Sequence, residues 1–170
     1  MKDIEIEIQA RIERSSILRD FLEKEAKFVS ENHQIDQYFT PAHENFVSVK
    51  PIEEWVRIRD ENSVYTINYK KWHYENGIGQ YADEYETEVK DKDAANKIFT
   101  AIDMKPLIVV DKTRRKYMYQ DYEVAFDEVV GLGSFVEIEY KGENGEDHKK
   151  ITQDMISFLK THDCGKDRKS

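Results

Sequence analysis

The first stretch of the chain alternates apolar and polar residues almost without interruption. It predicts a strand over residues 2–12, in which side chains point to opposite faces with period two. One face is apolar and carries Ile4, Ile6, Ile8, Ala10 and Ile12. The other is polar and carries Asp3, Glu5, Glu7, Gln9 and Arg11. The pattern indicates a half-buried strand whose polar face either meets solvent or directs a row of carboxylates at a cation.

Seven further segments have the alternation, or the β-branched and aromatic content, that is typical of strands. They cover residues 34–39, 55–59, 64–72, 81–89, 107–119, 122–130 and 134–141. Short polar or glycine-containing turns separate most of them, at residues 60–63, 76–79, 120–121 and 131–133. Connections this short favour antiparallel hairpins.

Three segments carry apolar residues at three- and four-residue spacing, which predicts amphipathic helices. The first begins at Ser15 or Ser16, either of which could cap it, runs past Val29 and ends at Asn32-His33. The others cover residues 91–103 and 151–162. Eight strands with three inserted helices predict an α+β fold: an eight-stranded antiparallel β-barrel, or tunnel, with the helices packed on the outside.

Length and composition add limits to this picture. The 170 residues fit one domain, which we place at residues 1–162, followed by a flexible C-terminal tail at 163–170. The net charge of −9 argues against general nucleic-acid binding, which needs basic patches. Cys164 is the only cysteine of the sequence, so an intramolecular disulfide is excluded. No signal peptide precedes the first strand and no apolar run approaches the roughly 20 residues that span a bilayer, so we expect a cytoplasmic protein without a membrane partner.

Charged residues recur on one face of several predicted strands. Examples are Arg57 with Arg59, Lys112 with Arg114 and Lys116, and Glu137 with Glu139. Each face alone could meet solvent, since antiparallel sheets often have one wet face. If the apolar faces support the helices, however, the charged faces line the interior of the barrel. Both signs of charge in an empty interior would be costly, but a metal-bound polyphosphate satisfies both, because carboxylates bind Mg²⁺ or Mn²⁺ and Arg and Lys bind phosphate oxygens.

Five short segments, in this order along the chain, together resemble the motifs of a known family. They are Glu5-Ile6-Glu7-Ile8-Gln9, Val56-Arg57-Ile58-Arg59, Asn68-Tyr69-Lys70, Lys112-Thr113-Arg114, and Asp127 followed by Gly131-Leu132-Gly133-Ser134-Phe135 and Glu137-Ile138-Glu139. From Asp3 to about Leu159, the chain resembles the CYTH domain family, the triphosphate tunnel metalloenzymes. Asp36-Gln37-Tyr38-Phe39 also resembles the D-x-Y-F element of its cyclase-like members.

The resemblance implies a tunnel that holds Mg²⁺ or Mn²⁺ and a triphosphate. The metal ligands that it implies are Glu5, Glu7, Asp127, Glu137 and Glu139. The residues that it implies for gripping the triphosphate are Arg57, Arg59, Lys70, Lys112 and Arg114, and we expect Glu5, Glu7, Lys112 and Arg114 to be catalytic. Gln9 stands where the family has a lysine and brings no charge; Arg11 on the same face could compensate, and we expect both to contact the triphosphate. Ala82 stands where many members carry an arginine.

The resemblance favours a class IV adenylyl cyclase-like enzyme, which converts ATP into cyclic AMP and pyrophosphate. Two alternatives stay open: a hydrolase similar to thiamine triphosphatase or inorganic tripolyphosphatase, and a non-catalytic binder of nucleotides or polyphosphate. The outcome depends on which phosphorus faces the attacking oxygen, and a strand pattern does not reveal this. The cyclase resemblance also suggests a homodimer.

Overall fold

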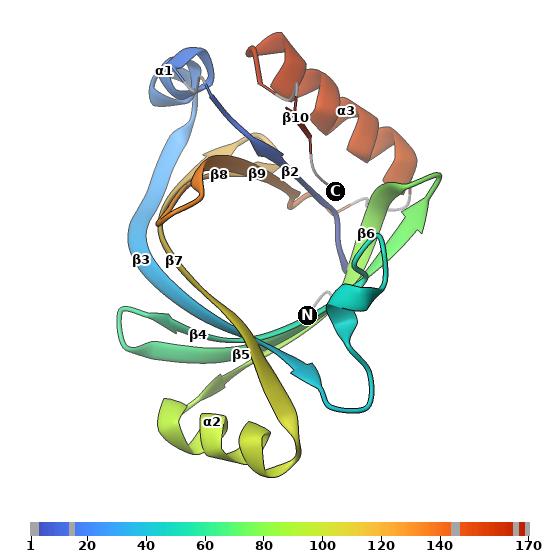
Figure 1. Ribbon diagram of the computed structural model, residues 1–170. Coiled ribbons are helices and arrows are strands. Elements are labelled where there is room, and N and C mark those ends of the chain that lie inside the picture. The colour runs from blue at the N-terminus through green and yellow to red at the C-terminus, as the bar shows by residue number, and fades with distance from the viewer. Residues whose placement is uncertain (1–3, 14–15, 144–146, 165–166, 169–170) are drawn as a thin grey trace.

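Figure 1 shows the computed structural model, in which helices lie outside one strongly curved sheet. The structure describes residues 4–13, 16–143, 147–164 and 167–168. The helices are α1 (Ser16–Glu25), α2 (Lys92–Ala101) and α3 (His148–Thr161), with a short 3-10 helix, η1, at Phe46–Ser48. The strands are β1 (Ile4–Glu5), β2 (Glu7–Arg11), β3 (Lys27–Pro41), β4 (Glu54–Glu61), β5 (Val64–Glu75), β6 (Ile78–Val89), β7 (Met104–Tyr119), β8 (Tyr122–Val129), β9 (Gly133–Tyr140) and β10 (Asp167–Arg168).

The barrel closes through the first stretch of the chain. The strand order is β1-β6-β5-β4-β3-β7-β8-β9-β2-β10, and every neighbouring pair is antiparallel. Only Ile6 separates β1 from β2, so one continuous stretch pairs first with β6 and then with β9. The predicted α+β antiparallel barrel is therefore confirmed. It has nine strands, β1 to β9, instead of eight, because the predicted first strand is split at Ile6 where it changes partner.

The first helix is shorter than its hydrophobic spacing predicted. It ends at Glu25 and not at Asn32-His33, and β3 begins at Lys27. The apolar spacing through Val29 fits a helical period, but β3 pairs with β7 almost from end to end, and this ladder decides its conformation. The predicted strand 34–39 is thus the second half of a longer one.

The ends of the other predicted strands differ from the observed ends by at most three residues. The predicted helices 91–103 and 151–162 are also present, and each begins after an aspartate that caps it. Asp91 accepts a hydrogen bond from the backbone N–H of Ala94, and Asp147 accepts one from that of Lys150. Because Asp147 caps α3, this helix starts three residues earlier than its apolar stripe predicted. Among the described residues, none of the helices combines the length and apolar character that crossing a membrane requires.

Part of the predicted tail pairs with the barrel. Asp167 lies opposite Arg11 and Arg168 opposite Ala10, so β10 continues the sheet beyond β2. Residues 165–166 and 169–170 lie outside the described residues, and so do Lys2, Asp3 and Ser15 of the predicted first strand and first helix. A flexible tail at 163–170 and domain bounds of 1–162 stay predictions.

The hydrophobic core lies outside the barrel, between the sheet and the helices. The larger cluster packs α1 and α3 against the outer face of β2, β8 and β9, and includes Ile6, Ile8, Ala10, Leu18, Leu22, Val136, Ile138, Met155 and Leu159. A smaller cluster packs α2 against β3 and β4, and includes Phe39, Val56, Ile58 and Ala95. The apolar faces therefore point outward to the helices, and the alternating charged faces point inward.

Replacing Leu18 by alanine tests this packing. Leu18 of α1 is fully buried, whereas Ile17 beside it is 53% exposed. We expect Leu18→Ala to lower the free energy of unfolding by about 3 kcal/mol and Ile17→Ala to change it by less than about 0.5 kcal/mol. Urea denaturation followed by circular dichroism measures both. Equal losses in the two variants would contradict the packing of α1 on the barrel.

Candidate functional site

The inward side chains of the barrel enclose a cavity of about 920 Å³. All strands from β1 to β9 contribute to its lining. Its acidic side chains are Glu5, Glu7, Glu84, Glu86, Glu123, Asp127, Glu137 and Glu139, and its basic side chains are Lys50, Arg57, Arg59, Lys70, Lys112, Arg114, Lys116 and Lys141. The formal charges of this lining therefore cancel. All sequence-predicted site residues except Arg11 lie among the lining residues.

The two ends of the cavity differ in character. Alternating strand directions bring the loop at 42–53 and the turns at 76–77 and 130–132 to one end. The lining near this end is largely apolar or aromatic: Ile52, Trp55, Trp72, Tyr74, Ile108, Val129, Leu132 and Phe135. The middle and the opposite end carry most of the charged residues. A ligand with one organic part and one highly charged part matches this division.

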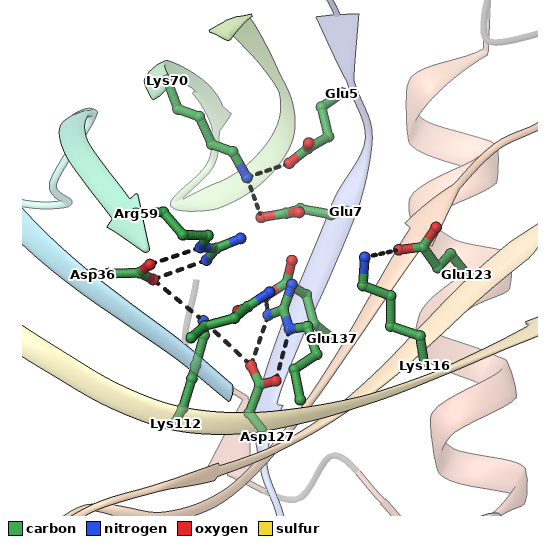
Figure 2. Close-up of polar contacts among 12 residues, drawn as sticks. Glu5, Glu7, Asp36, Arg59, Lys70, Lys112, Lys116, Glu123, Asp127 and Glu137 are labelled. Carbon is green, nitrogen blue, oxygen red and sulfur yellow. Dashed lines mark hydrogen bonds and ion pairs between the residues drawn. The ribbon is translucent and has the colours of Figure 1, made fainter. Parts of the chain in front are cut away.

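Asp36 and Arg59 form a buried bidentate pair (Figure 2). Arg59 donates from Nε to Oδ1 of Asp36 at 2.6 Å and from Nη2 to Oδ2 at 2.8 Å. Burial opposes ionisation of Asp36, but the hydrogen bonds and charge of Arg59 outweigh it and hold the pKa of Asp36 below its ordinary 3.8. The sequence motif contained Asp36 without giving it a role. Its alternation with Gln34 and Tyr38 was the signal that it faces inward.

Arg114 is held by two carboxylates. It donates from Nε and Nη2 to Asp127 at 2.7 and 2.6 Å, and from Nη2 to Glu137 at 2.9 Å. Lys112 Nζ lies 3.6 Å from the same Asp127 carboxylate and 3.7 Å from Asp36. Burial opposes ionisation of Glu137, but Arg114 outweighs it and keeps the pKa of Glu137 well below 4.5. Asp127 and Glu137, both predicted as metal ligands, are therefore paired with Arg114 in the free protein.

The other three predicted metal ligands come together. One carboxylate oxygen from each of Glu5, Glu7 and Glu139 lies within 4.8 Å of the others. We call these three residues the carboxylate cluster. Within the described part of the chain, Glu7 Oε2 is buried and has no hydrogen-bond partner. A hard divalent cation takes ligands of this kind, so the donor set fits Mg²⁺ or Mn²⁺.

Two pKa values in the carboxylate cluster are raised, because burial and the neighbouring carboxylates both disfavour negative charge there. Burial and the charges of Glu137 and Glu5 raise the pKa of Glu7 well above 4.5. Burial and the charge of Glu5 raise the pKa of Glu139 to about 7. In both carboxyl groups the charged form is disfavoured, and an added cation would offset this.

Lys70 of β5 is the cation that meets Glu5 and Glu7 of the carboxylate cluster in the free protein (Figure 2). Its Nζ lies 2.5 Å from Glu5, 3.3 Å from Glu7 and 3.5 Å from Glu84. Burial opposes ionisation of Glu5, but Lys70 outweighs it and lowers the pKa of Glu5 to about 2. Burial and a hydrogen bond with Glu5 raise the pKa of Glu84 to about 7. The sequence gave Glu84 no role, although Glu84 belongs to the predicted strand over residues 81–89.

Arg57 retains hydrogen-bonding capacity. Its side chain is 13% exposed, and its Nη2 lies 3.9 Å from Glu86, a distance too long for a hydrogen bond. Its Nε is buried and lacks a hydrogen-bond partner among the described residues. A buried guanidinium N–H that points to no acceptor is suited to a phosphate oxygen.

A second group of charges adjoins the carboxylate cluster through Glu139, and Figure 2 shows its Lys116–Glu123 pair. Lys116 Nζ lies 3.6 Å from Glu123, and Lys141 Nζ lies 4.0 Å from Glu123 and 2.9 Å from Glu139. The sequence placed Lys116 on the charged face of its strand but gave no role to Glu123 or Lys141.

The two departures from the family pattern lie in different surroundings. Gln9 lines the cavity but is exposed, and it lies opposite Glu137 across the β2–β9 ladder. Ala82 is fully buried and lies opposite Glu5 and Trp72. Arg11 is exposed and is not part of the lining, so no contact of Arg11 with a ligand in the cavity follows from its position.

Comparisons with known proteins agree with this geometry. A family model described as "CYTH domain" matches residues 3–167. A protein of Methanocaldococcus jannaschii, named a "putative adenylate cyclase", is 30% identical over 165 residues, which cover 96% of this chain and 92% of that protein.

Two solved structures are similar as well. The PH1012 protein of Pyrococcus horikoshii is 27% identical with a TM-score of 0.76, covering 97% of this chain and 94% of that one. A Hippeastrum protein, HpAC1, is 18% identical with a TM-score of 0.66, covering 95% and 88%. The latter is described as an adenylyl cyclase-like protein with a dominant triphosphatase activity. At 18% identity this likeness supports the fold alone.

Replacing Asp36 by asparagine tests the buried pair. Arg59 would keep its burial but lose its charged partner, so we expect the free energy of unfolding to fall by about 3 kcal/mol at neutral pH. Asp60→Asn is the matched control, since Asp60 on the same strand as Arg59 pairs with the partly exposed Lys92. We expect less than about 1 kcal/mol for that variant.

The difference between the wild type and Asp36→Asn should also depend on pH. Because the pKa of Asp36 is lowered by folding, its contribution is fully present above its unfolded pKa, near 3.8. It should shrink as the pH falls below about 4 towards the lower, folded-state pKa. Urea denaturation at several pH values measures this. A difference that stays constant down to pH 3 would contradict the ionised Asp36–Arg59 pair.

Proposed function

This chain belongs to the CYTH domain family, and we propose that it is a divalent-metal-dependent enzyme that acts on the triphosphate group of ATP. The proposal rests on one observation: groups that could bind phosphate and groups that could bind a metal ion line the same cavity. Arg57, Arg59, Lys112 and Arg114 supply cationic donors, and the carboxylate cluster supplies ligands for a hard cation. A metal–triphosphate complex is a ligand that uses both.

The charge balance of the cavity supports the need for a metal. The acidic and basic lining residues are equal in number, so the free cavity has no formal charge to offset a highly negative triphosphate. A divalent ion, when bound, neutralises phosphate charge and assists the attacking and leaving oxygens. Glu5, Glu7 and Glu139 would hold that ion.

The basic side chains would position the phosphates. Arg57 has an unused buried donor, and phosphate oxygens could replace the carboxylates that now pair with Arg114 and Lys112. Asp36 holds the Arg59 guanidinium in a fixed orientation. Such preorganised donors reduce the entropy that must be lost when the reacting atoms are aligned in line.

The reaction that we propose is cyclisation of ATP to cyclic AMP and pyrophosphate. The ribose 3′-oxygen forms a bond to the α-phosphorus, the bond from this phosphorus to the pyrophosphate oxygen breaks, and the hydroxyl proton is lost to solvent or a nearby base. The apolar end of the cavity supports an organic triphosphate because it offers Ile108, Leu132 and Phe135 to a nucleoside. The name of the 30% identical relative supports the same choice.

Incubation with Mg²⁺ or Mn²⁺ and one of three substrates tests the proposal. We expect ATP to yield cyclic AMP and pyrophosphate, detected by chromatography. Release of inorganic phosphate from ATP, thiamine triphosphate or tripolyphosphate without cyclic AMP would replace the cyclase assignment with a hydrolase. Binding of all three without turnover would leave a non-catalytic triphosphate binder.

Glu7→Gln tests the role of the carboxylate cluster. Since burial and the neighbouring carboxylates raise the pKa of Glu7, its negative charge is disfavoured at this position, and we expect the fold to survive its replacement by a neutral amide. Metal-dependent turnover should fall by roughly a hundredfold or more, because the amide is a weaker metal ligand than a carboxylate. Glu88→Gln, on the exposed part of β6, is the control and should keep full activity. Equal turnover in wild type and Glu7→Gln would contradict this metal site.

Gln9→Lys tests whether the family's missing cation can be restored. Gln9 lines the cavity, so a lysine there would add one positive charge within reach of a bound triphosphate. We expect the affinity for tripolyphosphate to rise by roughly five- to tenfold, equivalent to one charge-assisted hydrogen bond. Isothermal titration calorimetry measures it. Arg11→Lys is the control, since Arg11 lies outside the lining and already carries a charge. An unchanged affinity for Gln9→Lys would show that position 9 does not face the phosphates.

A further inference from the structure

Lys70 lies where a metal ion bound by the carboxylate cluster would lie. Its Nζ contacts Glu5 at 2.5 Å and Glu7 at 3.3 Å, and these are two of the three residues of the cluster. The lysine side chain is only 12% exposed and the two carboxylates 7% and 10%. Burial keeps this contact away from bulk solvent, so the ammonium group is the nearest compensation for the negative charge of Glu5 and Glu7.

An ammonium and a divalent ion cannot share this place. Mg²⁺ approaches its oxygen ligands to about 2.1 Å, so an ion bound to Glu5 and Glu7 would be in direct contact with the position of Lys70 Nζ. Two cations at a separation of a few ångströms in a poorly hydrated interior repel each other strongly. Lys70 must therefore move when the metal binds.

We propose that Lys70 is a resident counter-cation: it occupies the metal site in the free protein and leaves it when metal and triphosphate bind together. This rests on the metal site of the proposed function. The lysine is needed in the free protein because buried carboxylates without a cation are strongly destabilising. It compensates them incompletely, since Glu7 Oε2 still lacks a hydrogen-bond partner among the described residues. A dication that reaches all three carboxylates would compensate them better.

The displaced ammonium group needs a new partner, and the triphosphate provides one. Lysine has a flexible four-carbon stem and three donors that can be redirected. Arg57 and Arg114, which would grip the phosphates, line the same cavity as Lys70. The triphosphate therefore accepts the cation that the metal expels. Each ligand removes an obstacle to the other, so their affinities must rise together and by the same factor.

The cavity offers a matched control. Lys116 lines the same cavity but pairs with Glu123 at 3.6 Å, and Glu123 does not belong to the carboxylate cluster. Removing its charge should change the overall charge of the cavity by the same amount as removing that of Lys70. Only the loss of Lys70 should empty the metal site itself.

Calorimetric titration with Mn²⁺ in the absence of any triphosphate tests the proposal directly. We expect Lys70→Gln to bind Mn²⁺ at least tenfold more tightly than the wild type, and Lys116→Gln to stay within about threefold of it. The two variants lose the same formal charge, so an effect of the net charge of the cavity alone would give equal gains. Equal gains, or no gain for Lys70→Gln while the wild type binds Mn²⁺, would overturn the counter-cation role and leave the metal site standing.

A second measurement needs only the wild type and so does not depend on the folding of the variant. An ATP analogue with methylene groups in place of both bridging oxygens should raise the Mn²⁺ affinity of the wild type at least tenfold. Equal Mn²⁺ affinities with and without the analogue would overturn the proposal. If neither the wild type nor Lys70→Gln binds Mn²⁺ under either condition, the metal site of the proposed function falls as well.

Discussion

The interior of this barrel is governed by the need to pair every buried charge. A barrel lined by carboxylates, guanidinium groups and ammonium groups is stable only if each finds a partner, because an uncompensated buried charge costs several kcal/mol. Arg114 with Asp127 and Arg59 with Asp36 meet this need with bidentate hydrogen bonds. Lys70 meets it for Glu5 and Glu7, and Lys141 for Glu139. The groups that we propose to bind the ligand thus act, in the free protein, as one another's counter-ions.

This interior depends on the packing outside it. Because successive side chains of a strand alternate, the inward charges of β2, β8 and β9 are interleaved with outward apolar residues, which α1 and α3 cover. Helix α2 covers a second apolar patch on β3 and β4. The first stretch of the chain shows the coupling most clearly. Its buried isoleucines, Ile6, Ile8 and Ile12, pack in the larger core, while Glu5 and Glu7 point into the cavity. Its change of partner at Ile6 closes the barrel. The stretch formed by β1 and β2 therefore supplies two residues of the carboxylate cluster and also joins the two edges of the sheet.

Period-two alternation was enough to predict the barrel and to identify which side chains face inward. It was misleading where an apolar spacing fits two periods: the spacing through Val29 suggests helix, and only pairing with the distant β7 makes this segment a strand. The alternation also did not predict which charges meet across the cavity. Asp127 and Glu137 share the inward face with Glu139, yet they pair with Arg114, whereas Glu139 joins Glu5 and Glu7. Such pairings depend on the tilt and closure of the barrel, which no single strand encodes.

The equality of acidic and basic lining residues has a consequence for how a ligand enters. A triphosphate alone would have to break the ion pairs of Arg114 and Lys112 and would leave Asp127 and Glu137 without cations. The contacts of the triphosphate would have to outweigh the free energy lost with these buried pairs. A metal ion alone would have to expel Lys70. When the two arrive together, the metal offsets part of the phosphate charge, so the total charge of the cavity changes less than with the triphosphate alone. If the proposed function holds, the pairing that stabilises the barrel would therefore favour a triphosphate that carries its own cation.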